Sequence, residues 1–154
     1  MGRIADFMAR DHDRLDGLFR EFRGTKRSDL RHAKQFFREF NQGLQRHIVW
    51  EEDVLFPSFE RQTGMQDQGP TAVMRAEHRR IHDVLSQIHD RIGQGDAACD
   101  ALEERLISLL AAHNQKEESI LYPWIDRSLS EQQAEATLAK MVGMTSDQFT
   151  HCCE

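Results

Sequence analysis

Cysteine, proline and long apolar runs are all scarce in this chain of 154 residues. No run of about eighteen apolar residues occurs, so we expect no membrane-spanning segment. The first residues lack the apolar stretch of a signal peptide. There are three cysteines, and an odd number with two adjacent does not predict a disulfide framework. These absences favour a protein of the reducing cytoplasm.

The three cysteines lie in two places. Cys99 comes near the start of an expected helix and should be passive. The segment His151-Cys152-Cys153-Glu154 could bind metal or react with oxidants. An unstructured tail is the favoured interpretation.

Acidic residues outnumber basic ones by 26 to 20, which gives a formal net charge of −6. A negative protein is repelled by the phosphates of nucleic acids and by anionic membranes. We therefore expect neither of them as the main partner. The length suits one domain with a proper core.

Apolar residues recur at helical spacing along four long segments, which are separated by glycines and prolines. The expected helices run over about 4–23, 28–62 and 71–93, and from the turn at 93–96 to about residue 127. A shorter helix is expected over about 131–141, because Ser130 and Gln133 have the spacing of a capping box. Short loops make neighbouring helices antiparallel. The sequence thus predicts an all-α fold, with an up-down-up-down four-helix bundle over residues 1–128 and a short C-terminal helix and tail over residues 129–154.

The chain repeats part of itself at an offset of 66 residues. Residues 47–57 and 113–123 share the pattern His-x-x-x-Glu-Glu-x-aliphatic-Leu-aromatic-Pro. At the same offset, residues 11–16 align with residues 77–82. Two motifs at one offset predict that the first two helices form one half of the bundle and the next two helices the other. Residues that face the axis in one half should therefore face it in the other.

Histidines and acids interrupt the apolar face of each expected helix, in pairs four residues apart. Side chains at that spacing lie one turn apart on the same face, so both can reach one metal. The pairs are His12 and Asp16, His47 and Glu51, His78 and His82, and His113 and Glu117. A lone histidine on a core face is usually a hydrogen-bonded core residue, but burying this many unpaired polar groups would cost several kcal/mol each. We therefore predict a metal site inside the bundle.

The type and number of these ligands indicate which metal they hold. Without Asp16, the five imidazoles and two glutamate carboxylates exceed the four ligands of a tetrahedral zinc ion, and no cysteine is in register with them. Mixed nitrogen and oxygen donors suit iron, manganese or zinc. Seven ligands fit two metals with the two glutamates as bridges, an arrangement found in other helical bundles.

The ordered motifs His, His-x-x-x-Glu, His-x-x-x-His and His-x-x-x-Glu, within about residues 8–127, resemble the hemerythrin-like or HHE cation-binding family. The resemblance implies two non-haem iron ions with an oxo or hydroxo group between them. The ligands it implies are His12 and His47 for one iron, His78, His82 and His113 for the other, and Glu51 and Glu117 as bridges. The iron with fewer ligands would keep an open position for oxygen or nitric oxide.

The second bridge departs from the pattern of the oxygen-carrying hemerythrins. Those proteins have His followed five residues later by Asp, whereas here Glu117 follows His113 by four residues and Glu118 by five. Glu117 fits the internal repeat, and this variant looks more like the regulatory and iron-handling members. Asp16 aligns with His82 in the repeat. It is expected to be a further ligand, a hydrogen-bond acceptor from a ligand imidazole, a proton donor beside the open position or an ordinary exposed acid.

Three functions are compatible with such a site. The first is a module that binds or senses oxygen or nitric oxide, or that handles iron. The second is an enzyme that reduces peroxide or nitric oxide or acts as an oxidase, with a redox partner that the sequence does not identify. The third is a regulatory or interaction module whose fold depends on iron. The histidine-rich shell leaves little negative charge to stabilise high-valent iron, so we favour binding of a small diatomic ligand over catalysis.

Three aromatic or histidine side chains near the expected site are placed outside it or beneath it. Tyr122 follows Glu117 by five residues, about 140° round an α-helix, and should face away from the ligands. Trp124 should share the ligand face and close the core beneath the site. His89 is expected to be a core or second-layer histidine, too far along its helix to reach the metals.

Overall fold

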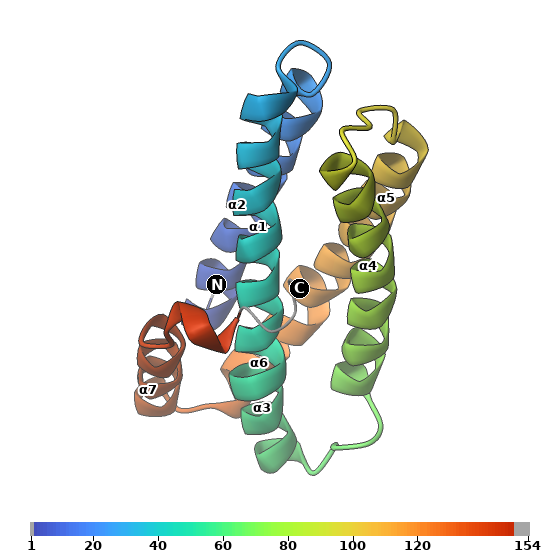
Figure 1. Cartoon of the computed structure of the whole chain (residues 1–154). Coiled ribbons are helices and arrows are strands. Elements are labelled where there is room, and N and C mark those ends of the chain that lie inside the picture. Colours follow the sequence, from blue (N-terminus) through green and yellow to red (C-terminus); the bar gives the residue numbers. More distant parts are fainter. Residues whose placement is uncertain (1, 150–154) are drawn as a thin grey trace.

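The computed structural model describes residues 2–149, and most of them lie in helices. Four long helices build the bundle (Figure 1). They are α1 (Arg3–Thr25), α2 (Leu30–Val49), α4 (Pro70–Gly93) and α5 (Asp100–Lys116). α1 and α2 form one antiparallel hairpin and α4 and α5 form the other, with the tips of both hairpins at the same end of the molecule (Figure 1). The predicted all-α bundle is confirmed.

Two of the bundle helices continue through a π-helical turn into a further α-helix. α2 is followed by η1 (Trp50–Leu55) and α3 (Phe56–Thr63), and α5 is followed by η2 (Glu117–Leu121) and α6 (Tyr122–Ser128). The last described elements are α7 (Glu131–Val142) and the short 3-10 turn η3 (Ser146–Gln148). α7 is the predicted short C-terminal helix, and it lies beside the end of the bundle opposite the hairpin tips (Figure 1).

Local signals in the sequence set several helix ends. Asp29 caps α2, and its side chain accepts a hydrogen bond from the backbone N–H of His32. Ser130 and Gln133 form the predicted capping box of α7. α3 ends at Gly64, whose φ of 76° lies in the left-handed region that glycine adopts without steric cost.

The two π-helical turns occupy matching places in the repeat. In each turn a backbone N–H donates to the carbonyl five residues earlier, Phe56 to Glu51 in η1 and Tyr122 to Glu117 in η2. A proline follows directly in both cases, and proline has no N–H to donate to the carbonyl four residues back. Because a π turn closes over five residues, the side chain five positions on returns to nearly the same face of the helix.

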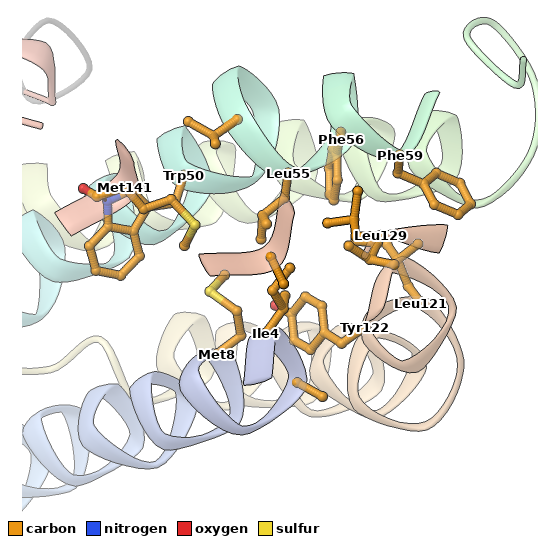
Figure 2. Close-up of a cluster of buried hydrophobic side chains, with 14 of the residues drawn as sticks. Ile4, Met8, Trp50, Leu55, Phe56, Phe59, Leu121, Tyr122, Leu129 and Met141 are labelled. Atoms are coloured by element: carbon orange, nitrogen blue, oxygen red, sulfur yellow. Dashed lines mark hydrogen bonds between the residues drawn. The ribbon is translucent and has the colours of Figure 1, made fainter. Parts of the chain in front are cut away.

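Two apolar clusters fill the bundle, one toward each end. The cluster toward the hairpin tips gathers the rings of Phe19, Phe22, Phe37 and Phe40 with aliphatic side chains of α4 and α5. The other cluster joins α1, η1, α3, α6 and α7 (Figure 2). Along α1, α2 and α4, and along α5 with its continuation η2, buried polar residues separate the members of one cluster from those of the other. A polar layer therefore crosses the bundle between two apolar layers.

α7 covers the second cluster from outside the bundle. Its Met141 is fully buried, and the Trp50 indole N–H donates to the Met141 backbone carbonyl over 2.9 Å (Figure 2). The division of the chain at residue 128 stays a prediction. Among the described residues, no helix is both long and apolar enough to cross a membrane.

Candidate metal centre

Six side chains form the polar layer, and we call them the polar cluster. They are His12 of α1, His47 of α2, Glu51 of η1, His78 of α4, His113 of α5 and Glu117 of η2. None of them is more than 4% exposed. Each sits where the sequence predicts a ligand, between the apolar residues of its helix. The fold therefore gathers four imidazoles and two carboxylates from both halves of the repeat.

Each imidazole of the polar cluster is bound from outside by a further carboxylate through its Nδ1 atom. The pairs are His12 with Glu118 (2.8 Å), His47 with Asp11 (2.8 Å), His78 with Glu52 (2.6 Å) and His113 with Glu77 (2.8 Å). A carboxylate can accept only from a protonated Nδ1, so this contact leaves the Nε2 lone pair as the donor atom for a metal. Carboxylates in this role commonly support metal-bound histidines.

These four outer carboxylates occupy matching positions in the two halves of the repeat, but they were not among the predicted site residues. Asp11 aligns with Glu77, and Glu52 aligns with Glu118. Their signal is present in the sequence, because an acid precedes the first histidine of each half and a second glutamate follows each bridging position. Burial raises the pKa of the Glu52 carboxyl, but the hydrogen bond and charge of His78 outweigh it and hold that pKa below its usual value.

The four Nε2 atoms converge on the two inner carboxylates. Glu117 Oε1 lies 3.3 Å from His12 Nε2 and 3.2 Å from His113 Nε2. Glu51 Oε1 lies 3.1 Å from His78 Nε2 and 3.8 Å from His47 Nε2. The donor atoms form two groups in which all atoms lie within 4.8 Å of one another. One group is His12, His47 and Glu117, and the other is Glu51, His78, His113 and Glu117.

Three of the inner atoms are buried without a hydrogen-bond partner among the described residues. They are Glu51 Oε1, Glu117 Oε2 and His78 Nε2. Glu51 Oε1 and His78 Nε2 are close enough to interact, yet they do not have hydrogen-bond geometry. Leaving a buried polar atom unpaired costs about 1–3 kcal/mol, and more for a charged group. A bound cation would satisfy all three atoms at once, so the residues present fit a metal.

Charges inside the polar cluster are balanced by protons on the imidazoles. Burial would lower the pKa of His12, but Glu117 outweighs it and raises that pKa to about 9. The pKa of His78 is raised to about 10 in the same way, with Glu51 as the strongest opposing partner. Burial raises the pKa of Glu51, and the neighbouring Glu117 raises it further. The cluster therefore attracts positive charge, as a metal site does.

Tyr122 is a member of this site that the sequence places wrongly. Its hydroxyl lies 2.8 Å from Glu51 Oε2 and 3.0 Å from Glu117 Oε1, so it does not face away from the ligands. The reason is the π turn, since Tyr122 follows Glu117 by the five residues that such a turn closes. Trp124 lies half-buried against Phe59 in the apolar cluster below the site, which agrees with its predicted place in the core beneath the ligands. Burial and the two carboxylates raise the pKa of Tyr122 well above its usual value.

His82 and Asp16, the matching pair one turn beyond the first histidines, lie outside both donor groups. His82 is half-buried, because the buried stripe of α4 runs through Ile81 and Leu85 and His82 stands about 100° from Ile81. His82 would have to turn inward to join the cluster. His89 is 53% exposed, so its prediction as a core residue is wrong.

A small cavity of about 10 Å³ adjoins the polar cluster on the side of the hairpin tips. Its apolar lining comes from Leu15, Phe40, Leu44, Ile48, Ile81 and Leu110. Asp16 borders this cavity and also two outer pockets, so it stands where the cavity meets the surface. Partial burial raises the pKa of Asp16. Of the roles predicted for this residue, the exposed acid near the site describes its position.

The cysteines contribute no thiolate to the site in the described part of the chain. Cys99 is buried before α5, and its Sγ–H donates to Glu103 Oε2 over 2.9 Å. Burial and Glu103 raise the pKa of the Cys99 thiol to about 12, which agrees with a passive residue. The segment 151–154 lies outside the described residues.

The sequence of this chain is similar to those of known proteins. A family model described as the hemerythrin HHE cation binding domain matches residues 3–125. An uncharacterized hemerythrin-like protein of Schizosaccharomyces pombe is 28% identical over 134 residues, which cover 87% of this chain and 64% of that protein. Proteins called iron-sulfur cluster repair protein YtfE, from Yersinia pestis and Yersinia pseudotuberculosis, are each 32% identical over 89 residues, or 52% of this chain and 40% of theirs. The chain thus spans less than two thirds of the length of these relatives. No solved structure matches it significantly.

Proposed function

This chain belongs to the hemerythrin HHE cation-binding family, and we propose that its polar cluster holds two non-haem iron ions that bind a small diatomic ligand, oxygen or nitric oxide. One iron is assigned to His12 and His47 and the other to His78 and His113. Glu51 and Glu117 are the carboxylates shared between them. The observation that carries the proposal is the set of buried inner atoms that lack a hydrogen-bond partner within residues 2–149.

The donor set favours a first-row transition metal, and the likeness to hemerythrin proteins and to iron-sulfur cluster repair proteins favours iron among these metals. Four imidazole nitrogens with carboxylate oxygens suit a first-row transition metal, whereas calcium and magnesium prefer oxygen alone. Thiolates, which would favour zinc or an iron–sulfur cluster, do not contribute to either donor group. Bound iron would supply redox activity and positions for an exogenous ligand.

The cavity beside the polar cluster favours a very small ligand. Its volume of about 10 Å³ is close to the least that holds one water molecule. Side chains of Leu15, Leu44 and Leu110 line it, so an apolar diatomic gas is a better match than a charged or bulky substrate. Both histidines of the first group and both of the second also line the cavity, which brings a ligand there next to either iron.

Metal content and gas binding test this proposal on the purified chain. After anaerobic loading with ferrous iron, we expect two irons per chain, and a visible absorption that forms on admitting oxygen and reverses on evacuation. His113→Ala should lose iron, while His89→Ala, which changes an exposed histidine outside the cluster, should retain it. Absence of bound iron, or one zinc in its place, would overturn the metal assignment. Steady consumption of oxygen over many turnovers would replace ligand binding with catalysis.

A second candidate function, the handling of iron for other proteins, is favoured by the names of the Yersinia relatives. In this function the chain would give up its iron to an acceptor that lacks it. Incubation of the iron-loaded chain with an apo iron–sulfur protein and sulfide, in the presence of a chelator that traps free iron, tests the transfer. Recovery of the cluster faster than from ferrous iron under the same chelator would support it, and equal or slower recovery would exclude it.

A further inference from the structure

Four donor atoms of the polar cluster surround the Tyr122 hydroxyl. Its Oη atom lies 2.8 Å from Glu51 Oε2, 3.0 Å from Glu117 Oε1, 3.1 Å from His47 Nε2 and 3.4 Å from His12 Nε2. The side chain is fully buried, and its ring is fixed in the apolar cluster below the site (Figure 2). The hydroxyl is thus the only polar part of a side chain that is otherwise core.

Hydrogen bonding alone does not account for this surrounding. A phenol has one hydrogen to donate, and an ionised carboxylate only accepts. The hydroxyl can therefore donate to Glu51 or to Glu117, but not to both. The two imidazoles add further atoms at similar distance, and an imidazole that keeps its hydrogen on Nδ1 and gives up any proton on Nε2 can offer the Nε2 lone pair to a metal. Together with the phenol oxygen, these four atoms make five potential ligand atoms, and such a group is typical of the surroundings of a cation.

The spacing of these atoms matches the ligands of one metal ion. Ligand atoms about 2.1 Å from a first-row metal, at right angles to one another, lie about 3.0 Å apart. The four distances from Oη bracket that value. We infer that Tyr122 is an additional ligand of the iron held by His12 and His47, bound through its oxygen as a phenolate. The inference rests on the proposed function, because it needs that iron. On binding ferric iron, the iron–oxygen bond forms as the O–H bond breaks, and the proton leaves to solvent without a change of oxidation state.

The internal repeat makes the two irons unequal. The residue that matches Tyr122 is Phe56, whose ring stacks on His78 with the ring centres 5.9 Å apart and an angle of 8°. Phenylalanine offers no oxygen, so only the iron of His12 and His47 receives a phenolate. Tyr122 is not among the residues that line the small cavity. The phenolate therefore occupies a position away from the cavity and leaves the cavity side open to a diatomic ligand.

Spectroscopy of the iron-loaded chain tests this ligand directly, because Tyr122 is the only tyrosine in the sequence. In the ferric protein we expect a visible phenolate-to-iron charge-transfer band, with tyrosine ring vibrations enhanced by resonance Raman excitation in that band. Ring-deuterated tyrosine should shift those vibrations with no substitution in the chain. Tyr122→Phe should abolish the band and keep both irons, since phenylalanine already fills the matching position in the other half. Trp124→Phe, a matched aromatic change two residues away, should leave the band in place.

The outcomes separate this inference from the proposed function. Two irons per chain without a phenolate band in the unaltered protein would overturn the tyrosine ligand and leave the di-iron proposal standing. The tyrosine ligand would also be overturned by a band that persists in Tyr122→Phe, or by ring vibrations whose frequencies do not shift on deuteration. Failure of the unaltered chain to bind iron would overturn both. If Tyr122→Phe fails to fold, the isotope shift in the unaltered chain still decides the question.

Discussion

Each histidine of the polar cluster is hydrogen-bonded to a carboxylate that lies outside both donor groups. His47 donates from Nδ1 to Asp11, which is itself nearly buried beside Arg14 and Arg46. The negative charge makes the imidazole a better donor to a cation and holds its ring in one orientation. At the scale of single residues, the outer carboxylates should therefore control how tightly iron is bound.

Asp11→Asn isolates that effect, because asparagine keeps the size of the side chain and removes its charge. We expect iron affinity to fall by about 10- to 100-fold with helix content unchanged. Competition with a chelator of known affinity measures the change. Asp13→Asn is the matched control, since Asp13 is an exposed acid two residues further along the same helix. Equal affinities in the two variants would show that the outer carboxylates do not tune the site.

The raised pKa values of His12 and His78 make the metal-free protein sensitive to alkali. A histidine with a pKa near 6.5 when unfolded and about 9 or 10 when folded binds more protons in the folded state between those values. The stabilisation is complete below pH 6.5 and is lost as the pH rises through 9 and 10. We expect the free energy of unfolding of the metal-free chain to fall over this range, as urea titrations at several pH values would show.

His89→Gln, a change of an exposed histidine, should leave that pH dependence intact. Stability that rises from neutral to alkaline pH would contradict the assignment of these protons. The same protons must leave when a metal takes the imidazole nitrogens. Calorimetry of iron binding in buffers of different ionisation enthalpy should therefore detect proton release at neutral pH.

At the scale of helices and turns, substitution by alanine should raise the stability of the fold at one glycine and lower it at another. Gly17 lies inside α1, and a Cβ added there meets nothing within 4 Å. Gly17→Ala should stabilise the fold by about 0.5–1 kcal/mol, because alanine loses less backbone freedom in a helix. Gly64 ends α3 with a φ of 76°, which alanine adopts at a cost of about 1 kcal/mol. Thermal unfolding of the two variants gives the comparison, and a shift of the same sign in both would contradict it.

Helix content, helix ends, the inward position of His12 and the histidine–glutamate pairs of the second and fourth helices could be predicted from the sequence because they depend on local signals. Ser130 and Asp29 are caps by their chemistry, and His47 with Glu51 obeys helical spacing. Tyr122 could not be assigned to the right face, because a π turn interrupts the α-helical period between Glu117 and Tyr122. A proline directly after the matching motifs was the available sign of a π turn. The helical spacing predicts His82 and His89 on the inner face of α4, whereas the buried stripe passes through Ile81 and Leu85 and leaves His82 half-buried and His89 exposed.

At the scale of the whole molecule, the hairpins are tied together at their tips by a buried ion pair. Lys26, just after α1, lies 2.5 Å from Glu103 in the first turn of α5, and both side chains are almost inaccessible. Lys26→Ala would leave the buried Glu103 with Arg23 as its remaining cationic partner among the described residues. We expect the free energy of unfolding to fall by about 3 kcal/mol.

Urea unfolding of the metal-free chain measures this loss. Arg27→Ala is the control, since the Arg27 side chain is 63% exposed and pairs with Asp100 at the surface, where an ion pair contributes at most about 1 kcal/mol. Lys26→Met combined with Glu103→Leu should recover much of the stability, because neither buried charge is then left alone. A small loss in Lys26→Ala would show that the hairpin tips do not need this pair.

Iron should also stabilise the contact between the two hairpins, at the centre of the bundle. Glu117 of the second half faces His12 of the first, and Glu51 of the first half faces His78 of the second. Metal held by both halves stabilises the folded state by mass action, by about 2.7 kcal/mol when free iron is 100-fold above its dissociation constant. We expect iron to raise the melting temperature and to slow amide exchange in both hairpins together, while His113→Ala should show neither effect. Slower amide exchange in one hairpin alone would mean that the metals are held within one half. Glu51 and Glu117 would then not connect the two halves through the metal.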